Sequence, residues 1–281
     1  MATNYKEFCL KEYKSLFEQN LEAFASSIKD LKKRRTEAQK KAIKDASVNA
    51  IKAYPEIEPA DIWKNIYIAH VYNVSKIEDS KIINAVISAN NSWMKSSGHA
   101  FEEMIKELGN LSLKSHDIEI ILQKDLNLLL KADALDNEVR DISWLKEQIK
   151  SSVFDLYLTI KDGDSTTVFG CIQSKTSIRD RVTRDREPSL QAMSAFFMSI
   201  AIVLDGDFMK LPKFQHMVNG GSPDYPKNGW HGMYVFSNAE IENDRIHSMN
   251  ITMDNLVNHV VQAAKFWTKQ RQWFDYKWKP E

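Results

Sequence analysis

Residues 153–175 have the sequence VFDLYLTIKDGDSTTVFGCIQSK, and this stretch decides the fold. Its first part is rich in aromatic and branched residues that favour a strand, and its last part has a second strand pattern. Between them, Lys161-Asp162-Gly163-Asp164 is typical of a tight turn. We therefore predict an antiparallel hairpin. Because both lie far from the turn, Asp155 is expected to lie close to residues 171–175.

Side-chain alternation along the two strands predicts which residues share a face. Asp155 falls on one face of its strand, and Gln173 and Lys175 fall on one face of the next. A carboxylate and a lysine at strand ends suit metal-assisted hydrolysis of a phosphodiester, in which the carboxylate holds Mg²⁺ and the lysine stabilises charge. An exposed ion pair between neighbouring strands is the alternative interpretation.

The segment after the second strand contains Arg179-Asp180-Arg181, and Arg184 follows soon after. Arginine can bind guanine through two hydrogen bonds, and a carboxylate can accept a hydrogen bond from cytosine in the major groove. The tripeptide therefore contains the groups needed to read neighbouring C·G pairs. A solvated charged loop with internal salt bridges is the alternative.

The composition limits the class of protein. The chain has 281 residues, 43% of them hydrophobic, and its 38 Lys and Arg residues balance 38 Asp and Glu residues, so any basic surface must be local. Its two cysteines, Cys9 and Cys171, indicate neither a disulfide framework nor a zinc site. Gly220-Gly221 lacks the context of a nucleotide-binding loop. Without a signal peptide or a bilayer-spanning apolar stretch, we expect a soluble cytoplasmic protein.

Two regions are expected along the chain. Residues 1–90 form a helical N-terminal region, and residues 91–281 form an α/β domain for catalysis and DNA recognition. The helices expected in the first half lie within residues 1–54, after Glu58-Pro59, over residues 79–89, and after Ser96-Ser97-Gly98. In the second half, we expect a helix over residues 188–204, a strand over residues 233–236, and a closing helix over residues 253–274.

These motifs together resemble a known family. Asp155 with Gln173-Ser174-Lys175 resembles the PD-(D/E)XK nuclease core, and Arg179-Asp180-Arg181 resembles the R-(D/E)R motif of type II restriction endonucleases that recognise CCGG. Other segments are similar to members of the same family, at residues 60–63, 92–102, 219–221, 230–234 and 271–274. The resemblance implies a restriction-endonuclease-like core, with a central mixed β-sheet flanked by helices.

The resemblance also implies catalytic roles. Asp155 would be the primary Mg²⁺ ligand and Lys175 the catalytic lysine. Gln173 stands where the simple motif has its second acid, so that acid is expected from the following helix, as Glu187 or, failing that, Asp185. Glu102 resembles a glutamate of the first core helix that supports the metal through a water. The candidate catalytic residues are Asp155, Lys175, Glu187 and Glu102, and the candidate metal ligands are Asp155 and Glu187.

Duplex DNA containing CCGG is the substrate that the resemblance implies, and a closer similarity within the family implies the form WCCGGW. The candidate DNA contacts are Arg179, Asp180, Arg181, Ser174 and Arg184. A palindromic site predicts a homodimer or a higher homo-oligomer, with the helical region aiding dimerisation or DNA embrace, and a methyltransferase as functional partner. Two alternatives stay open: a repair or recombination nuclease without CCGG preference, and an inactive DNA-binding protein.

Overall fold

The structure, a computed structural model, describes residues 2–77, 79–177, 182–205, 209, 211–236, 243–250, 252–270 and 275–280. Arg179, Asp180 and Arg181 lie outside these residues. The chain divides into two compact units, Met1–Trp93 and Met94–Glu281. Each unit is described by itself, and the functional roles predicted for the two regions stay predictions.

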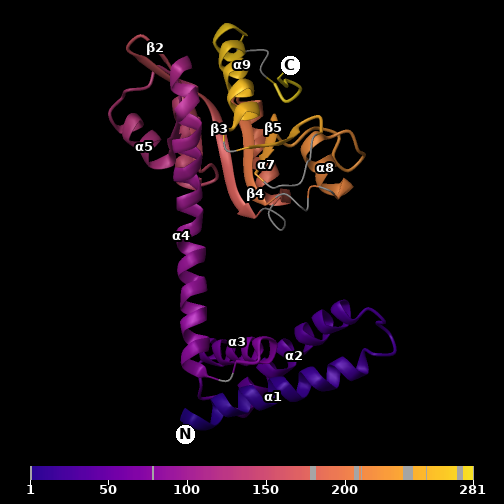
Figure 1. Ribbon diagram of the computed structural model, residues 1–281. Helices are drawn as coiled ribbons and strands as arrows, with labels where there is room; N and C mark the ends of the chain where they lie inside the picture. Colours follow the sequence, from indigo (N-terminus) through magenta and orange to yellow (C-terminus); the bar gives the residue numbers. More distant parts are fainter. Residues whose placement is uncertain are drawn as a thin grey trace. The chain divides into compact units, whose positions relative to one another are not determined.

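Helices make up the first part of the chain, and helices and strands alternate in the second (Figure 1). In chain order the elements are α1 (Ala2–Ala23), α2 (Leu31–Ala53), α3 (Pro59–Ser75), α4 (Ser80–Leu113), a short 3₁₀ helix (Lys114–His116), β1 (Ile118–Leu122), α5 (Gln123–Lys131), α6 (Val139–Ser151), β2 (Leu156–Asp162), β3 (Ser165–Ser177), α7 (Val182–Ser194), β4 (Met198–Asp205), α8 (Pro212–Asn219), β5 (Gly232–Val235), β6 (Ile246–Ser248) and α9 (Asp254–Gln270).

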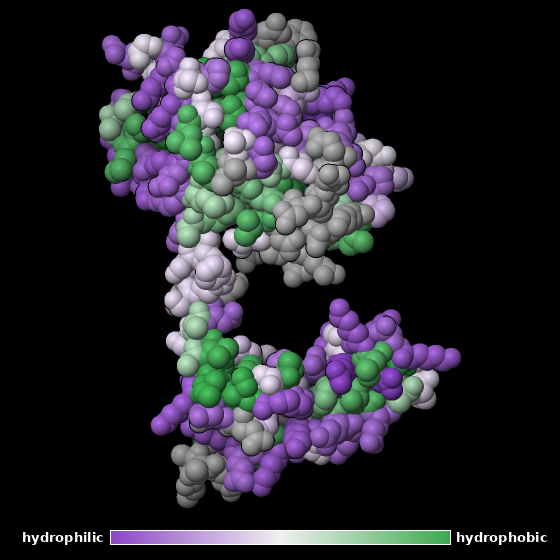
Figure 2. Space-filling view, in the orientation of Figure 1, coloured by the Kyte–Doolittle hydropathy of each residue, from purple (hydrophilic) through white to green (hydrophobic). Residues whose placement is uncertain are grey.

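Small residues let the helices of the N-terminal unit pack closely. Ala42, Ala46 and Ala50 recur every four residues on α2, and they are fully buried against α1 and α3. The predicted helices over residues 1–54 and after Pro59 are confirmed. Across the described helices, the structure shows no apolar stretch long enough to cross a bilayer. Figure 2 shows that part of this unit's surface is hydrophobic.

The prediction of two separate helices around Ser96-Ser97-Gly98 is wrong, because α4 continues through these residues. A glycine weakens a helix interior by about 1 kcal/mol but does not end it unless the chain turns to a positive φ. Gly98 does not adopt a positive φ, and a Cβ atom there would meet nothing within 4 Å.

The second unit is built on a six-stranded sheet with the order β1-β2-β3-β4-β5-β6. The first three strands pair antiparallel, and β3 to β6 pair in parallel, so the sheet is mixed, as predicted. Hydrophobic side chains alternate between its two faces. Those of one face, such as Ile172 and Ile200, pack against α4 and α9. Those of the other face, such as Tyr157 and Ala201, pack against α5, α6, α7 and α8.

The prediction of a single helix over residues 188–204 is also wrong. Helix α7 begins earlier, at Val182, keeps Pro188 in its interior, and ends at Ser194, and the apolar run that follows forms strand β4. A central strand that is buried on both faces reads as a continuous apolar run, and its pattern does not separate it from a buried helix.

An asparagine takes the place of a neighbouring strand at the β1 edge. The side chain of Asn110 accepts a hydrogen bond from the N–H of Ile120 at 2.7 Å and donates one to its carbonyl at 2.9 Å. The side chain therefore satisfies the backbone groups that an edge strand leaves unpaired.

Candidate active site

Asp155 stands directly before β2 and is held by β3. Its N–H donates to the carbonyl of Ile172 at 3.1 Å. Its Oδ2 accepts hydrogen bonds from the N–H of Ser174 at 2.7 Å and from Nζ of Lys175 at 2.8 Å. The side chains of Lys175 and Asp155 are only 16% and 18% exposed. The hairpin therefore brings the two residues together as predicted, in a largely buried pair and not in an exposed one.

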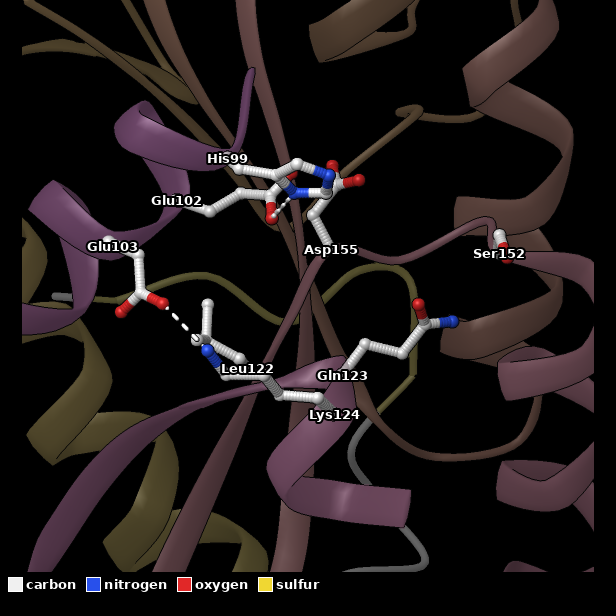
Figure 3. Close-up of a pocket in the computed structure, with 8 residues that line it drawn as sticks. All are labelled: His99, Glu102, Glu103, Leu122, Gln123, Lys124, Ser152 and Asp155. Atoms are coloured by element: carbon white, nitrogen blue, oxygen red, sulfur yellow. Dashed lines mark hydrogen bonds and ion pairs between the residues drawn. The ribbon is translucent and has the colours of Figure 1, made fainter. Parts of the chain in front are cut away.

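A cavity of about 500 Å³ opens beside Asp155 (Figure 3). Helix α4 contributes Glu102 to it, and the start of α5 contributes Gln123. The remaining lining residues are His99, Glu103, Leu122, Lys124 and Ser152. Glu102 and Asp155 thus present two carboxylates to one space.

A second cavity, of about 330 Å³, adjoins the first at Ser152, which lines both. Lys175 lines this second cavity together with Arg184 and Asp185 from the first turns of α7. Asp155 lines the first cavity and Lys175 lines the second. Because the two side chains are hydrogen-bonded to each other, the pair lies between the two cavities.

Burial raises the pKa of Glu102, and the negative charge of Asp155 raises it further. A hydrogen bond from His99, whose Nδ1 lies 3.2 Å from Oε2 of Glu102, and the charge of Lys175 act in the opposite direction. Burial outweighs the opposing contributions, so the pKa of Glu102 lies above its ordinary value.

Replacing Glu102 with glutamine is expected to raise the melting temperature of the metal-free protein at neutral pH. A carboxyl whose folded-state pKa is raised contributes stability below its unfolded-state pKa and loses that contribution as pH rises through the folded-state pKa. The gain of Glu102→Gln should therefore be present at pH 7 and disappear near pH 4. Thermal melts across this pH range measure it.

The neighbouring substitution Glu103→Gln is the control, because Glu103 is an exposed partner of Lys124. It should give no gain at pH 7. An unchanged or lower melting temperature of Glu102→Gln at pH 7 would contradict the raised pKa of Glu102.

The structure separates the two acids proposed as second metal ligand. Asp185 lines the cavity that contains Lys175, whereas Glu187 is exposed and lines neither of the two cavities. Their roles stay predictions, but the placement favours Asp185. Ser174 is buried and positions Asp155 through its N–H, and Arg184 is exposed at the second cavity.

The donor set suits Mg²⁺, which proteins commonly bind through one or two carboxylates, with waters and substrate phosphates completing the coordination. Both hydrogen bonds that the Asp155 carboxylate accepts within the described chain reach Oδ2, which leaves Oδ1 for a cation. Among the described residues, no three carboxylate, imidazole or thiol side chains converge on one point.

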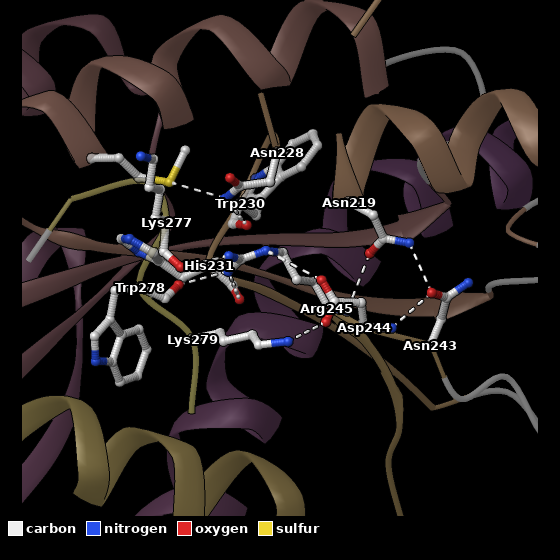
Figure 4. A network of polar contacts seen from close by, with 11 residues as sticks. Asn219, Asn228, Trp230, His231, Asn243, Asp244, Arg245, Lys277, Trp278 and Lys279 are labelled. Carbon is white, nitrogen blue, oxygen red and sulfur yellow. Dashed lines mark hydrogen bonds and ion pairs between the residues drawn. The ribbon is translucent and has the colours of Figure 1, made fainter. Parts of the chain in front are cut away.

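Trp230 donates a hydrogen bond to Gln173 on β3, and its neighbour His231 lies beside the C-terminal residues Lys277 and Trp278 (Figure 4). Nδ1 of His231 accepts a hydrogen bond from the N–H of Ser199 at 3.0 Å, and its Nε2 lies 2.8 Å from the carbonyl of Asp275. Burial lowers the pKa of His231 to about 3, so this histidine is neutral and structural. Arg245 donates to the carbonyls of His231, Lys277 and Trp278.

The sequence did not predict the structural role of Gln173, because its hydrogen-bond partner Trp230 is distant in sequence. It also did not predict that Ser152 lines both cavities. Near the C-terminus, Trp267 and Trp278 pack on the core. Trp273 and Phe274 lie outside the described residues.

The mixed sheet, the Asp155–Lys175 pair on its hairpin and the carboxylates of the flanking helices are the features that the resemblance to restriction endonucleases implied. Residues 137–273 match the family model of the BsaWI restriction endonuclease type 2. The crystal structure of a pre-specific restriction endonuclease BsaWI–DNA complex superposes with a TM-score of 0.81, at 54% identity over 98% of both chains. The chain belongs to the BsaWI family of type II restriction endonucleases.

A more distant relative is the type II restriction enzyme AgeI of Thalassovita gelatinovora. It is 27% identical over 195 residues, which cover 66% of this chain and 64% of AgeI, so the match spans just under two thirds of that enzyme. The predicted resemblance to type II restriction endonucleases is confirmed, together with the predicted fold and enzyme class.

Proposed function

We propose that this protein cuts both strands of duplex DNA at a palindrome that contains CCGG, with Mg²⁺ as its cofactor. The observation that carries the proposal is the largely buried Asp155–Lys175 pair between two carboxylate-lined cavities. The similarity to the BsaWI structure, which contains DNA, supports DNA as the substrate.

In the proposed reaction, Asp155 and Asp185 would hold the cation, and Glu102 would support it from α4. When bound, Mg²⁺ lowers the pKa of the attacking water and neutralises charge on the phosphate. Lys175, placed by its bond to Asp155, donates to a phosphate oxygen or orients the water. Arg184, which is exposed at the second cavity, would bind a DNA phosphate.

Base reading is proposed for Arg179, Asp180 and Arg181 on the sequence alone. We expect Arg179→Ala to reduce the preference for CCGG over an altered core by about 1–3 kcal/mol, because it removes a two-bonded guanine contact. Competition binding between the two duplexes at fixed salt measures the preference. An equal loss of affinity for both duplexes would mean that Arg179 contacts only phosphate.

A homodimer with one active site per strand matches the two-fold symmetry of a palindrome. Exposed apolar side chains on α3, among them Trp63, Tyr67 and Val74, support the proposal that the N-terminal unit takes part in association. Sedimentation of the protein with and without DNA measures the assembly.

Digestion of a sequenced plasmid with Mg²⁺ and with EDTA tests the proposed activity. Discrete fragments that require Mg²⁺ are expected. A smear would instead indicate a nuclease without site preference. Binding to CCGG duplexes without any cutting would indicate an inactive DNA-binding protein.

A further inference from the structure

Gln173 occupies the acid position of the nuclease motif, but its side chain forms hydrogen bonds with Trp230 and with the backbone of Asp185. It lies on β3, two residues before Lys175, and is 0% exposed. Its Oε1 accepts a hydrogen bond from the indole N–H of Trp230 at 2.8 Å, and its Nε2 donates to the backbone carbonyl of Asp185 at 3.0 Å. The buried amide thus joins the catalytic strand to helix α7.

An amide fits both partners without a change of protonation. An indole N–H can only donate a hydrogen bond, and a backbone carbonyl can only accept one. An ionised glutamate at position 173 would direct an oxygen at the carbonyl of Asp185, and a leucine would leave both buried groups unsatisfied. The partners also fix the orientation of the Gln173 amide, with Oε1 toward Trp230.

The start of α7 needs such an anchor because Pro188 lies inside the helix. Proline lacks an N–H, so the carbonyl four residues earlier, that of Arg184, receives no helical hydrogen bond. The turns that carry Arg184 and Asp185 are instead tied to the rest of the unit by Gln173 and by Arg186. Arg186 donates to the carbonyls of Met217 and Lys227.

We propose that Gln173, held by Trp230, is a positioning residue that sets Asp185 at the distance from Lys175 and Asp155 at which it ligates the divalent cation. Gln173 and Lys175 lie on the same strand, so the bond to the Asp185 carbonyl fixes helix α7 relative to the catalytic lysine. The inference rests on the proposed function. The simple motif has its second acid on β3, whereas here Gln173 on β3 would position an acid on α7.

A double-mutant cycle on metal affinity tests the proposal. Mn²⁺ binding to the purified full-length protein is measured by EPR for the wild type, Gln173→Leu, Asp185→Asn and the double variant. Gln173→Leu is expected to weaken Mn²⁺ binding by about 10-fold, as substitutions of groups that orient metal ligands do. In the Asp185→Asn background it should cause no further loss, because Gln173 acts through Asp185.

Asn110→Leu is the matched control. It also deletes a buried amide with two backbone hydrogen bonds, but on α4 at the β1 edge. It should leave Mn²⁺ affinity unchanged at a comparable loss of melting temperature. Trp230→Phe, which keeps an aromatic ring and removes the donor to Gln173, should weaken Mn²⁺ binding in the same direction and carries the test if Gln173→Leu does not fold.

Three results would overturn the proposal: wild-type affinity in Gln173→Leu, independent losses that multiply in the double variant, or an equal loss in Asn110→Leu. The half-saturating Mg²⁺ concentration for cleavage should rise with the loss of Mn²⁺ affinity. Absence of metal-dependent cleavage in the wild type would overturn the proposed function itself, whereas a cleaving wild type with an unaffected Gln173→Leu variant would overturn only the role of Gln173.

Discussion

Lys175→Ala is expected to slow DNA cleavage by about 10³-fold or more, because it removes a preorganised cation from the transition state. Affinity for a CCGG duplex should stay close to that of the wild type, since Lys175 contacts no base in the proposed complex. Single-turnover cleavage with Mg²⁺ measures the first quantity, and equilibrium binding in EDTA measures the second.

Lys161→Ala is the control, because Lys161 is exposed on β2 at the turn end of the same hairpin. It should cleave at the wild-type rate. A Lys175→Ala variant that is folded and cleaves within a few-fold of the wild type would remove Lys175 from the mechanism.

Arg245→Met is expected to destabilise the second unit by about 3 kcal/mol, which corresponds to a fall in melting temperature of roughly 6–12 °C. Arg245 is 5% exposed and donates hydrogen bonds at 3.1, 2.7 and 2.9 Å to the carbonyls of His231, Trp278 and Lys277. The substitution leaves these carbonyls without their donor and should release the C-terminal segment, residues 275–280. Thermal melts and hydrogen exchange of that segment measure the two effects.

Lys279→Ala provides the comparison, because Lys279 forms an exposed ion pair with Asp244 in the same network. Such pairs contribute roughly 0–1 kcal/mol, so its melting temperature should change little. If Arg245→Met melts within a degree of the wild type, the network does not anchor the segment. The anchor matters for the site because His231 adjoins Trp230, the partner of Gln173.

The hairpin that carries Asp155 and Lys175 could be predicted because its signals are local. The strand pattern, the turn and the alternation of side chains are all readable within residues 153–175, and the structure brings the two residues together. The family resemblance added the functional class, which the comparisons confirm.

The positions of the two candidate second acids, Asp185 and Glu187, could not be predicted from the sequence, because they depend on where α7 begins. Proline is common in the first turn of a helix, so Pro188 indicated a start near residue 188, with Glu187 at its edge. The helix begins instead at Val182 and places Asp185 toward Lys175. Hydrogen bonds made by the side chains of Gln173 and Arg186 stabilise this earlier start. A local sequence pattern does not predict these bonds, because they join residues that are far apart in the sequence.

Strand β4 shows the same limit in the core. Its apolar residues fit a buried helix as well as a central strand, and only pairing with β3 and β5 distinguishes the two. Short elements such as β1 and β6 likewise owe their structure to the sheet and not to a pattern long enough to be recognised.

Sequencing every DNA end produced in a limited digest of bacterial genomic DNA tests the central claim most directly. Wild-type protein and Asp155→Asn are compared with Mg²⁺ and with EDTA. We predict that the ends from the wild type with Mg²⁺ fall at one palindrome containing CCGG, and that Asp155→Asn and the EDTA samples give none above background. Ends scattered over unrelated sequences, or cleavage by Asp155→Asn at the wild-type rate, would contradict the account.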